Sequence, residues 1–281
     1  MSSKAKRGVC PVLTVPLILV LCSCASGPRP PEKGTPGFYW LAAKETQKAG
    51  DFIKTLDHLD KLMAENSEYT TRALPWSLVL ASGLAKGYME LADHYELGAR
   101  ANKSDPSLFR KQVSQCRNFA GRLAMQVADN FGKLQAAKDE QIPLGFPYPS
   151  GTANVVPQLD RVVRGMAPQP AEMEAAQKRA LERGILLMTF RAAGSPDDAA
   201  RTQEFLRSGD AKVPRATFHL AMATALYEQG LLFGRQKLDQ PEKMQILLTR
   251  AQDVAKALPE SKQTKELTAK IQADLKKAAK K

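Results

Sequence analysis

The stretch FYWLAAKETQKAGDFIKTLDHLDKLMAEN, residues 38–66, predicts two consecutive helices with one break between them. The first is expected over 38–49, where Gly50 ends it, and the second runs from an Asp51 cap to about Glu65. Apolar residues of the second helix recur every three or four positions, so they share one face that must pack against another element. These residues are Phe52, Leu56, Leu59, Leu62 and Met63.

The same stretch resembles a tetratricopeptide repeat, which joins two helices around a Gly-Asp-aromatic turn, here Gly50-Asp51-Phe52. Three marker positions differ, because Ala43, Thr55 and Ser67 stand where Gly, Ala and Pro are usual. The pair also looks like the first repeat of BamD-type outer-membrane lipoproteins, which scaffold the assembly of outer-membrane proteins. This resemblance implies a protein-binding role.

A long helix is expected to begin at Pro75, with two glycines on its apolar face. Gly83 and Gly87 lie one helical turn apart, and glycine costs roughly 1 kcal/mol of helix propensity relative to alanine. Close approach of a second helix is the natural reason to keep them. The rest of the face consists of Trp76, Val79, Leu80, Leu84, Leu91 and Tyr95.

Ser104-Asp105-Pro106 is typical of a helix start, and the helix that follows carries a continuous apolar stripe. The stripe consists of Phe109, Val113, Cys116, Ala120, Leu123, Val127 and Phe131. Cys116 lies in its middle, which favours a buried free thiol over a reactive one. Four cations lie off the stripe and are expected to face solvent or to meet an acidic partner. They are Arg110, Lys111, Arg117 and Arg122.

The stretch QIPLGFPYPSGTANVVP, residues 141–157, has four prolines and two glycines and predicts a loop. Loops of this length are uncommon in compact domains and are often functional. The loop is either a passive crossover between two helical halves or a contact for a partner. Phe146 and Tyr148 are the candidate contact residues in the second case.

The remainder is again helical, and no window shows convincing strand alternation. Helices are expected over 158–165, over 171–190, after an N-cap at 195–198, from Pro214, after a capping box at 239–242, and from Ser261. The helix from Pro214 is apolar on more than one side and should be central. We therefore predict an all-α fold of about ten helices in antiparallel pairs, arranged as a tetratricopeptide-like array or a helical bundle.

The first 24 residues, MSSKAKRGVCPVLTVPLILVLCSC, have the organisation of an export signal. A positive start precedes an apolar run over 9–21 that is too short to span a bilayer, which needs roughly 20 residues. Leu21-Cys22-Ser23-Cys24 resembles the bacterial lipobox. The resemblance implies cleavage before Cys24 and acylation of that cysteine. Two or three acyl chains hold a protein firmly on a membrane.

Five segments follow from these patterns. We assign 1–23 to a lipoprotein signal peptide, 24–36 to the lipidated cysteine and a flexible tether, 37–138 to N-terminal helical repeats, 139–157 to the Pro/Gly-rich loop and 158–281 to a C-terminal helical region. Ala25 follows the cysteine. By resemblance to sorting rules in Gram-negative bacteria, this implies the outer membrane, facing the periplasm.

Charge and cysteine usage restrict the function further. The net charge is +12, and three positive charges leave with the signal, so the mature chain carries +9. Export argues against nucleic acid as the partner, which leaves anionic lipid, an acidic envelope protein or an ordinary solvated surface. Cys10 and Cys22 leave with the signal and Cys24 takes the lipid, so Cys116 has no partner for a disulfide.

No residue pattern points to an enzyme, a metal or a cofactor. His58, His94 and His219 lie far apart without metal-ligand spacing, and no phosphate-binding or nucleophile motif occurs. Two acidic pairs, Asp57 with Asp60 and Asp197 with Asp198, are best explained by solvation or capping. The sequence thus favours a scaffold that binds a protein partner in the envelope.

A second resemblance covers more of the chain. The helix order is similar to that of T-component lipoproteins of TRAP transporters, which are all-helical and built on degenerate tetratricopeptide-like pairs. The similar segments are DFIKTLDHLDKLMAEN at 51–66, WSLVLASGLAKGYMELADHYELG at 76–98, FRKQVSQCRNFAGRLA at 109–124 and AGSPDDAARTQEFLRSG at 193–209. This alternative implies a transporter accessory protein that binds a small ligand and a solute-binding protein.

Overall fold

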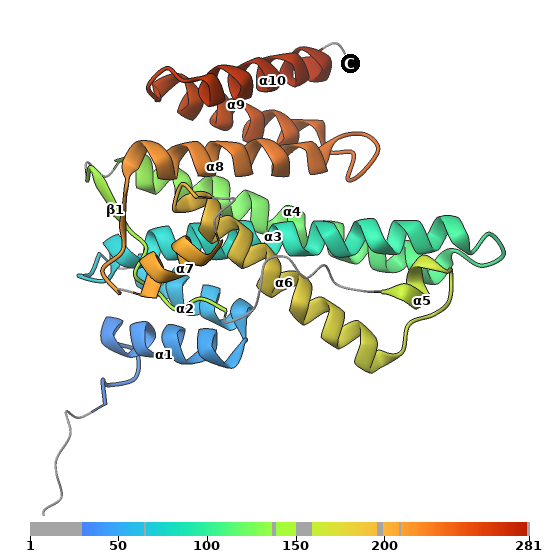
Figure 1. Cartoon of the computed structure of the whole chain (residues 1–281), viewed down its shortest axis with the longest axis horizontal. Helices are drawn as coiled ribbons and strands as arrows, with labels where there is room; N and C mark the ends of the chain where they lie inside the picture. The colour runs from blue at the N-terminus through green and yellow to red at the C-terminus, as the bar shows by residue number, and fades with distance from the viewer. Residues whose placement is uncertain are drawn as a thin grey trace, which may run out of the picture. The chain divides into compact units, whose positions relative to one another are not determined.

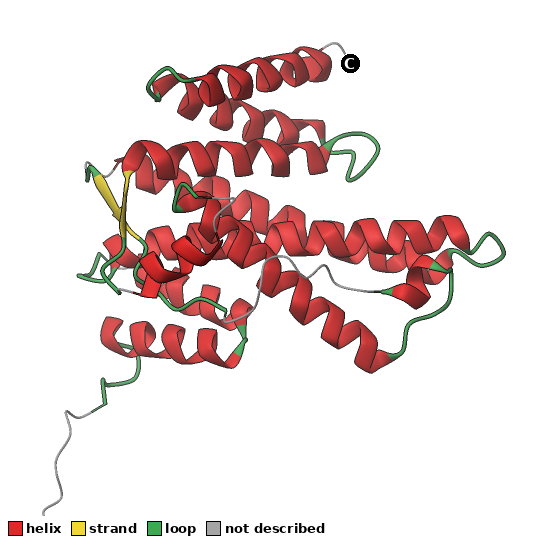
Figure 2. Cartoon of the chain, in the orientation of Figure 1, coloured by secondary structure: helices red, strands yellow, loops and turns green. Residues whose placement is uncertain are grey.

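The computed structural model describes residues 30–64, 66–136, 139–149, 159–195, 199–207 and 209–279. These residues form ten α-helices, one 3-10 turn and two short strands (Figures 1 and 2). All described residues except 30 and 31 belong to one compact unit, Glu32–Lys281. The predicted all-α class and the packed antiparallel pairs are confirmed.

The first two helices form the predicted hairpin. Helix α1 (Pro36–Ala49) ends at Gly50, which adopts a left-handed conformation with φ of +79°. Asp51 then accepts a hydrogen bond from the Lys54 amide at 3.2 Å and so caps α2 (Phe52–Ala64). The hydroxyls of Thr46 and Thr55 lie 3.0 Å apart and join the two helices. The predicted stripe of α2 is buried except for the half-buried Met63.

Helix α3 (Thr70–Ala101) is the centre of the fold (Figure 1). It is buried on all sides from Ala73 to Ala85, because α2, α4, α6 and α8 all pack against it. The prediction that it begins at Pro75 is wrong by about one turn. A proline removes one backbone hydrogen bond to the carbonyl four residues earlier, here that of Thr71. Thr71 is exposed, so water can satisfy that carbonyl.

Helix α6 (Pro170–Ala192) crosses α3 through glycines of both helices. A Cβ on Gly83 would lie 2.5 Å from the Ile185 Cα, and one on Gly184 would lie 2.1 Å from the Gly83 carbonyl oxygen. The close approach predicted from Gly83 and Gly87 is therefore confirmed. Arg183 adds an ion pair to the same contact by donating to both carboxylate oxygens of Glu90, at 2.7 and 2.8 Å.

Helix α4 (Ser107–Ala136) runs back along α3 and buries all seven predicted stripe residues (Figure 1). Asp105 accepts from the Ser107 amide at 3.2 Å, as a helix start requires. Of the four cations expected to face solvent, Arg117 does not. Its side chain is 12% exposed and pairs with Glu96 of α3, since the two helices lie side by side there. The short helix α5 (Asp160–Val163) packs on α3.

Two short strands correct the expectation that the chain has none. β1 (Gln141–Pro143) pairs antiparallel with β2 (Lys212–Pro214), with Ile142 opposite Val213. Three residues are too few to show alternation, and the partner lies about seventy positions away, so no local pattern reveals the pairing. Helix α7 (Ala199–Arg207) precedes β2. Of its predicted cap at 195–198, residues 196–198 lie outside the described residues.

Helix α8 (Arg215–Gly230) begins directly after Pro214, as predicted, and lies between α9 on one side and α4 and α6 on the other. The 3-10 turn η1 (Leu231–Phe233) then leads to α9 (Pro241–Ala257). The capping box predicted at 239–242 is wrong, since Gln240 is the N-cap and makes no side-chain cap bond. Pro241 is the first residue of the helix, a position at which a backbone amide has no partner within the helix, so proline is tolerated there. Ser261 caps α10 (Lys262–Ala279), which pairs with α9.

Candidate functional site

The sequence predicts three site residues, and the structure describes two of them. Cys24 lies outside the described residues. Phe146 follows β1 and is only 7% exposed, stacked on Trp76 of α3 with ring centroids 5.6 Å apart. Tyr148 is half-buried beside Phe146 and donates its hydroxyl proton to the Leu144 carbonyl. Burial raises the pKa of Tyr148 well above its usual value. Both rings therefore contact the protein's own core, and a partner-binding role of this loop stays a prediction.

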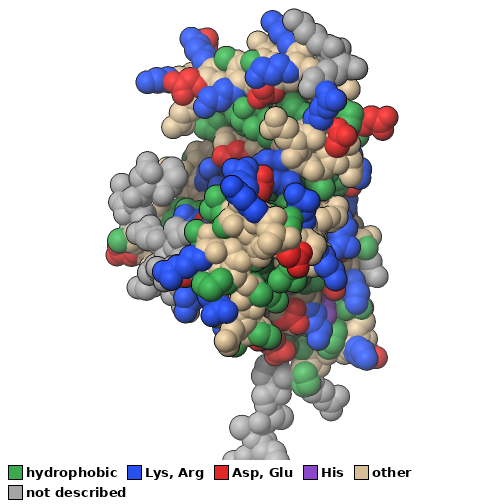
Figure 3. All heavy atoms as spheres, turned by 90° about the vertical axis from the view of Figure 1, so that its right-hand side faces the viewer, with side chains coloured by type: hydrophobic (Ala, Val, Ile, Leu, Met, Phe, Trp, Pro, Cys, Tyr) green, Lys and Arg blue, Asp and Glu red, His purple; other side chains and the backbone are tan. Residues whose placement is uncertain are grey.

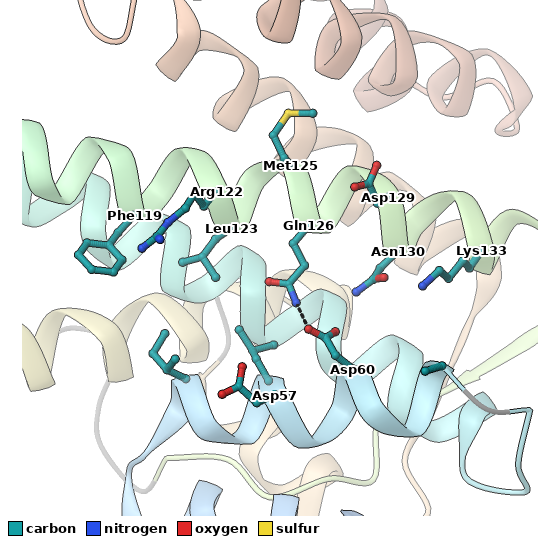
Figure 4. A pocket seen from close by; sticks show the side chains of 13 residues that line it. Asp57, Asp60, Phe119, Arg122, Leu123, Met125, Gln126, Asp129, Asn130 and Lys133 are labelled. Carbon is teal, nitrogen blue, oxygen red and sulfur yellow. Dashed lines mark hydrogen bonds between the residues drawn. The ribbon is translucent and has the colours of Figure 1, made fainter.

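A hollow with a volume of about 680 Å³ lies between α2 and α4. Figure 4 shows Asp57 and Asp60 reaching into it from α2, while Phe119, Gln126 and Asn130 reach into it from α4. We call it the α2–α4 groove. Its full lining is Ile53, Leu56, Asp57, Asp60, Ala64, Phe119, Arg122, Leu123, Met125, Gln126, Asp129, Asn130 and Lys133.

One wall of the α2–α4 groove is acidic. Asp60 accepts a hydrogen bond from the Gln126 side-chain amide at 2.8 Å, which ties α2 to α4 (Figure 4). Burial raises the pKa of Asp60, an effect that the hydrogen bond from Gln126 partly offsets. Asp57 is exposed one helical turn before it, and Asp129 is exposed on α4. Arg122 and Lys133 of α4 also line the groove, so three carboxylates stand against two cations, in a protein of net charge +12.

The other feature of the groove is exposed apolar surface. Ile53 and Phe119 are 43% and 40% exposed, although both lie in helices that bury a good apolar stripe. The Phe119 ring stacks on that of Tyr88, with centroids 5.2 Å apart. The Arg122 guanidinium lies over the Phe119 ring, 4.6 Å from its centroid. An apolar floor beside carboxylates suits a segment that presents apolar side chains next to Lys or Arg.

Histidine and cysteine side chains are the other chemically reactive groups among the described residues. The described residues contain no group of three or more His, Cys, Asp or Glu side chains placed to hold a metal ion. His58 faces Tyr39 of α1, and His219 packs edge-on against Phe131 of α4, so these histidines belong to different parts of the fold. Cys116 is a buried free thiol, as predicted, and burial raises its pKa to about 11. A thiol with that pKa is a poor nucleophile.

A second hollow of about 590 Å³ lies where the two strands meet α8 and α9. Its lining includes Gln141, Arg215, His219, Val254 and Leu258. His219 is 9% exposed, and its Nε2 is buried without a hydrogen-bond partner within the described part of the chain. Arg215 directs its guanidinium to the carbonyls of Leu134 and Gln135 at the end of α4. Apolar walls with a few convergent polar groups are typical of small-molecule sites.

Burial of His219 predicts an acid-sensitive fold. Burial, assisted by the nearby Arg215 charge, lowers the pKa of His219 from 6.5 to about 4. Between these pKa values the unfolded chain binds the extra proton, so stability falls as the pH falls through this window. At 1.36 kcal/mol per pKa unit, the loss at the acid end approaches about 3 kcal/mol. Denaturant titrations at several pH values should give a flatter profile for His219→Gln, and an unchanged profile would contradict this explanation.

Sequence reasoning missed the two groups of residues that define these hollows. Ile53 and Phe119 lie outside the buried apolar faces of their helices, so a search for apolar residues at helical spacing does not include them. The only signal for them is their placement on the polar sides of otherwise amphipathic helices. The second hollow depends on the pairing of β1 with β2, which has no local signal.

No protein-family model, curated protein or solved structure matches this chain. None of the described helices is both long and apolar enough to cross a bilayer.

Proposed function

We propose that this chain is a lipid-anchored protein of the bacterial cell envelope whose helical body binds a protein partner. The proposal places acyl chains on Cys24 and the body at the outer membrane, facing the periplasm. The observation that carries it is the lipobox-like Leu21-Cys22-Ser23-Cys24 after a charged and apolar leader. The packed helix pairs support it, because such pairs commonly serve as binding surfaces.

Within this proposal, the α2–α4 groove binds the partner. Ile53 and Phe119 provide exposed apolar surface, and Asp57, Asp60 and Asp129 provide carboxylates around it. A partner segment with that complementarity is an amphipathic helix or extended peptide with Lys or Arg beside its apolar side chains. The groove lies between two helices that the Gln126–Asp60 hydrogen bond joins, so we expect little ordering on binding.

Site-specific crosslinking in intact bacteria tests this role. A photoreactive residue at Phe119 should yield one discrete protein adduct. The same probe at Leu41 of α1, which is 41% exposed and away from the groove, should not yield it. A double change Asp57→Lys and Asp129→Lys should lower the adduct at least about tenfold, because like charges across an interface cost several kcal/mol. Identical adducts from both probe positions, or none from Phe119, would argue against the groove.

A second candidate function is an accessory lipoprotein of the T-component kind, which would bind a small ligand. The observation that favours it is the hollow beside His219, whose volume falls in the range of small-molecule sites. Small organic solutes should then raise the melting temperature of the protein. His219→Gln should abolish that rise, while a Phe119→Ala control should keep it. Absence of any rise across acidic, basic and neutral solutes would count against this candidate.

A further inference from the structure

One end of the compact unit collects exposed apolar side chains. Nine large apolar residues are exposed in the described part of the chain. Four of them lie at this end, two beside the turn between α3 and α4 and two in or just after α5. Leu97, Leu108, Val163 and Met166 are 41–46% exposed. We call residues 97–111 and 159–166 the basic tip. Figure 1 shows the α3–α4 turn and α5 together at one end of the longest helices.

The same end is rich in cations. Arg100, Lys103, Arg110, Lys111, Arg161 and Arg164 are all exposed, and only two acidic residues lie in these two segments. Figure 3 turns this end toward the viewer and shows Lys and Arg side chains gathered over its middle, with hydrophobic side chains among them. Arg100 pairs with Glu96, and Arg161 lies 3.9 Å from Glu172.

Four of these cations are available to a partner. Lys103, Arg110, Lys111 and Arg164 form no ion pair within the described residues. The nearby carboxylate of Asp105 is occupied, because it accepts from the Ser107 amide and hydroxyl at the start of α4. The positive charge of the tip is therefore not neutralised internally.

The two segments of the basic tip are held together. The Asn102 side-chain amide donates to the Gly165 carbonyl oxygen at 3.1 Å. Gly165 has φ of +76°, and a Cβ there would lie 2.8 Å from the Asn102 nitrogen. Val162 is buried against Gly98 of α3. The apolar and basic side chains of the tip are thus presented by one fixed scaffold rather than by independent loops.

We propose that the basic tip docks on the surface of an anionic lipid bilayer, with its four apolar side chains in the interface and its cations at the headgroups. Apolar residues interspersed with Lys and Arg are the pattern of interfacial membrane binding. Each cation near an anionic surface adds attraction that salt screens. The four apolar side chains lie around the end of a helical hairpin, which fits a broad lipid surface better than a peptide. Arg100 and Arg110 also border a hollow of about 390 Å³ between α3, α4 and residues 237–238. The proposal rests on the membrane location proposed above and gives the body a second contact besides the anchor.

The test uses the full chain as bacteria process it, reconstituted in vesicles. Met166→Cys carries an environment-sensitive fluorophore, and Ile246→Cys on α9, 48% exposed, is the matched control. Native Cys116 is buried and should not take the label. With phosphatidylcholine mixed with phosphatidylglycerol, the emission at position 166 should shift to the blue and that at 246 should not. High salt or phosphatidylcholine alone should remove the shift.

Charge variants measure the contribution of the cations. Removing Lys103, Lys111 and Arg164 together by substitution with Gln should lower the ratio of docked to undocked protein about fivefold per cation. Lys256→Gln, Lys262→Gln and Lys270→Gln on α9 and α10 remove the same charge elsewhere and should leave the ratio unchanged.

Two results would overturn the docking proposal. One is equal shifts at positions 166 and 246, and the other is no shift at 166 with anionic vesicles. The second result would assign the basic tip to an acidic protein instead. The mass of the N-terminal fragment of the same preparation reports acylation separately. The mass therefore tests the lipid anchor, and the emission shift at position 166 tests the docking, so the two proposals can fail independently.

Discussion

Gly184→Ala is expected to lower the free energy of unfolding by about 3 kcal/mol, the upper end of the usual cost of overpacking. The added Cβ would lie 2.1 Å from the Gly83 carbonyl oxygen and 2.8 Å from the Gly87 nitrogen. Both are backbone atoms of the central helix α3, so neither can move aside without displacing that helix. The loss should appear as a lower denaturant midpoint in unfolding followed by far-UV circular dichroism.

Gly132→Ala is the matched control for this prediction. Its Cβ would meet only the far end of the Arg250 side chain, at 2.9 Å. That end can move, at the cost of the hydrogen bond that its Nη1 donates to the Ala128 carbonyl. Alanine also gains up to about 1 kcal/mol of helix propensity over glycine. The control should therefore stay within about 1 kcal/mol of the parent protein. Equal losses from both substitutions would mean that the crossing of α3 and α6 is not the cause.

Phe146→Ala is expected to cost about 3 kcal/mol, as truncation of a buried phenylalanine does. Phe146 is buried on Trp76, which itself packs edge-on against Trp40, and Tyr148 completes the cluster. The variant should lose this stability and should also change the tryptophan emission, since the chain has only these two tryptophans. Unfolding followed in parallel by tryptophan fluorescence and circular dichroism measures both effects.

Phe119→Ala removes the same side chain from a site that is 40% exposed. Its expected cost is under about 1 kcal/mol, because little apolar surface returns to water. A small effect at Phe146, comparable with that at Phe119, would show that the segment after β1 is not part of the core.

Local sequence signals predicted much of the fold. The Gly50-Asp51 break, the stripe of α4 and the glycines of α3 each correspond to a local physical requirement, and each is found where expected. The errors come from tertiary context. Pro75 lies inside α3 because an exposed carbonyl tolerates the missing bond, and Arg117 is shielded because α3 provides Glu96. Neither the exposure of that carbonyl nor the position of Glu96 can be predicted from the residues next to Pro75 or Arg117.

The candidate sites were less predictable than the fold. Aromatic residues in a Pro/Gly-rich loop suggested a contact for a partner, but Phe146 is buried on the protein's own core. The α2–α4 groove and the basic tip each combine residues from segments distant in sequence. Exposure of an apolar side chain depends on what packs over it, and periodicity cannot supply that information.

The most direct test of the account is mass spectrometry of the amino-terminal fragment of the protein purified from bacterial membranes. We predict a chain that begins at Cys24 and carries the mass of two or three acyl chains. A chain that still begins at Met1, or one with an unmodified Cys24, would contradict it.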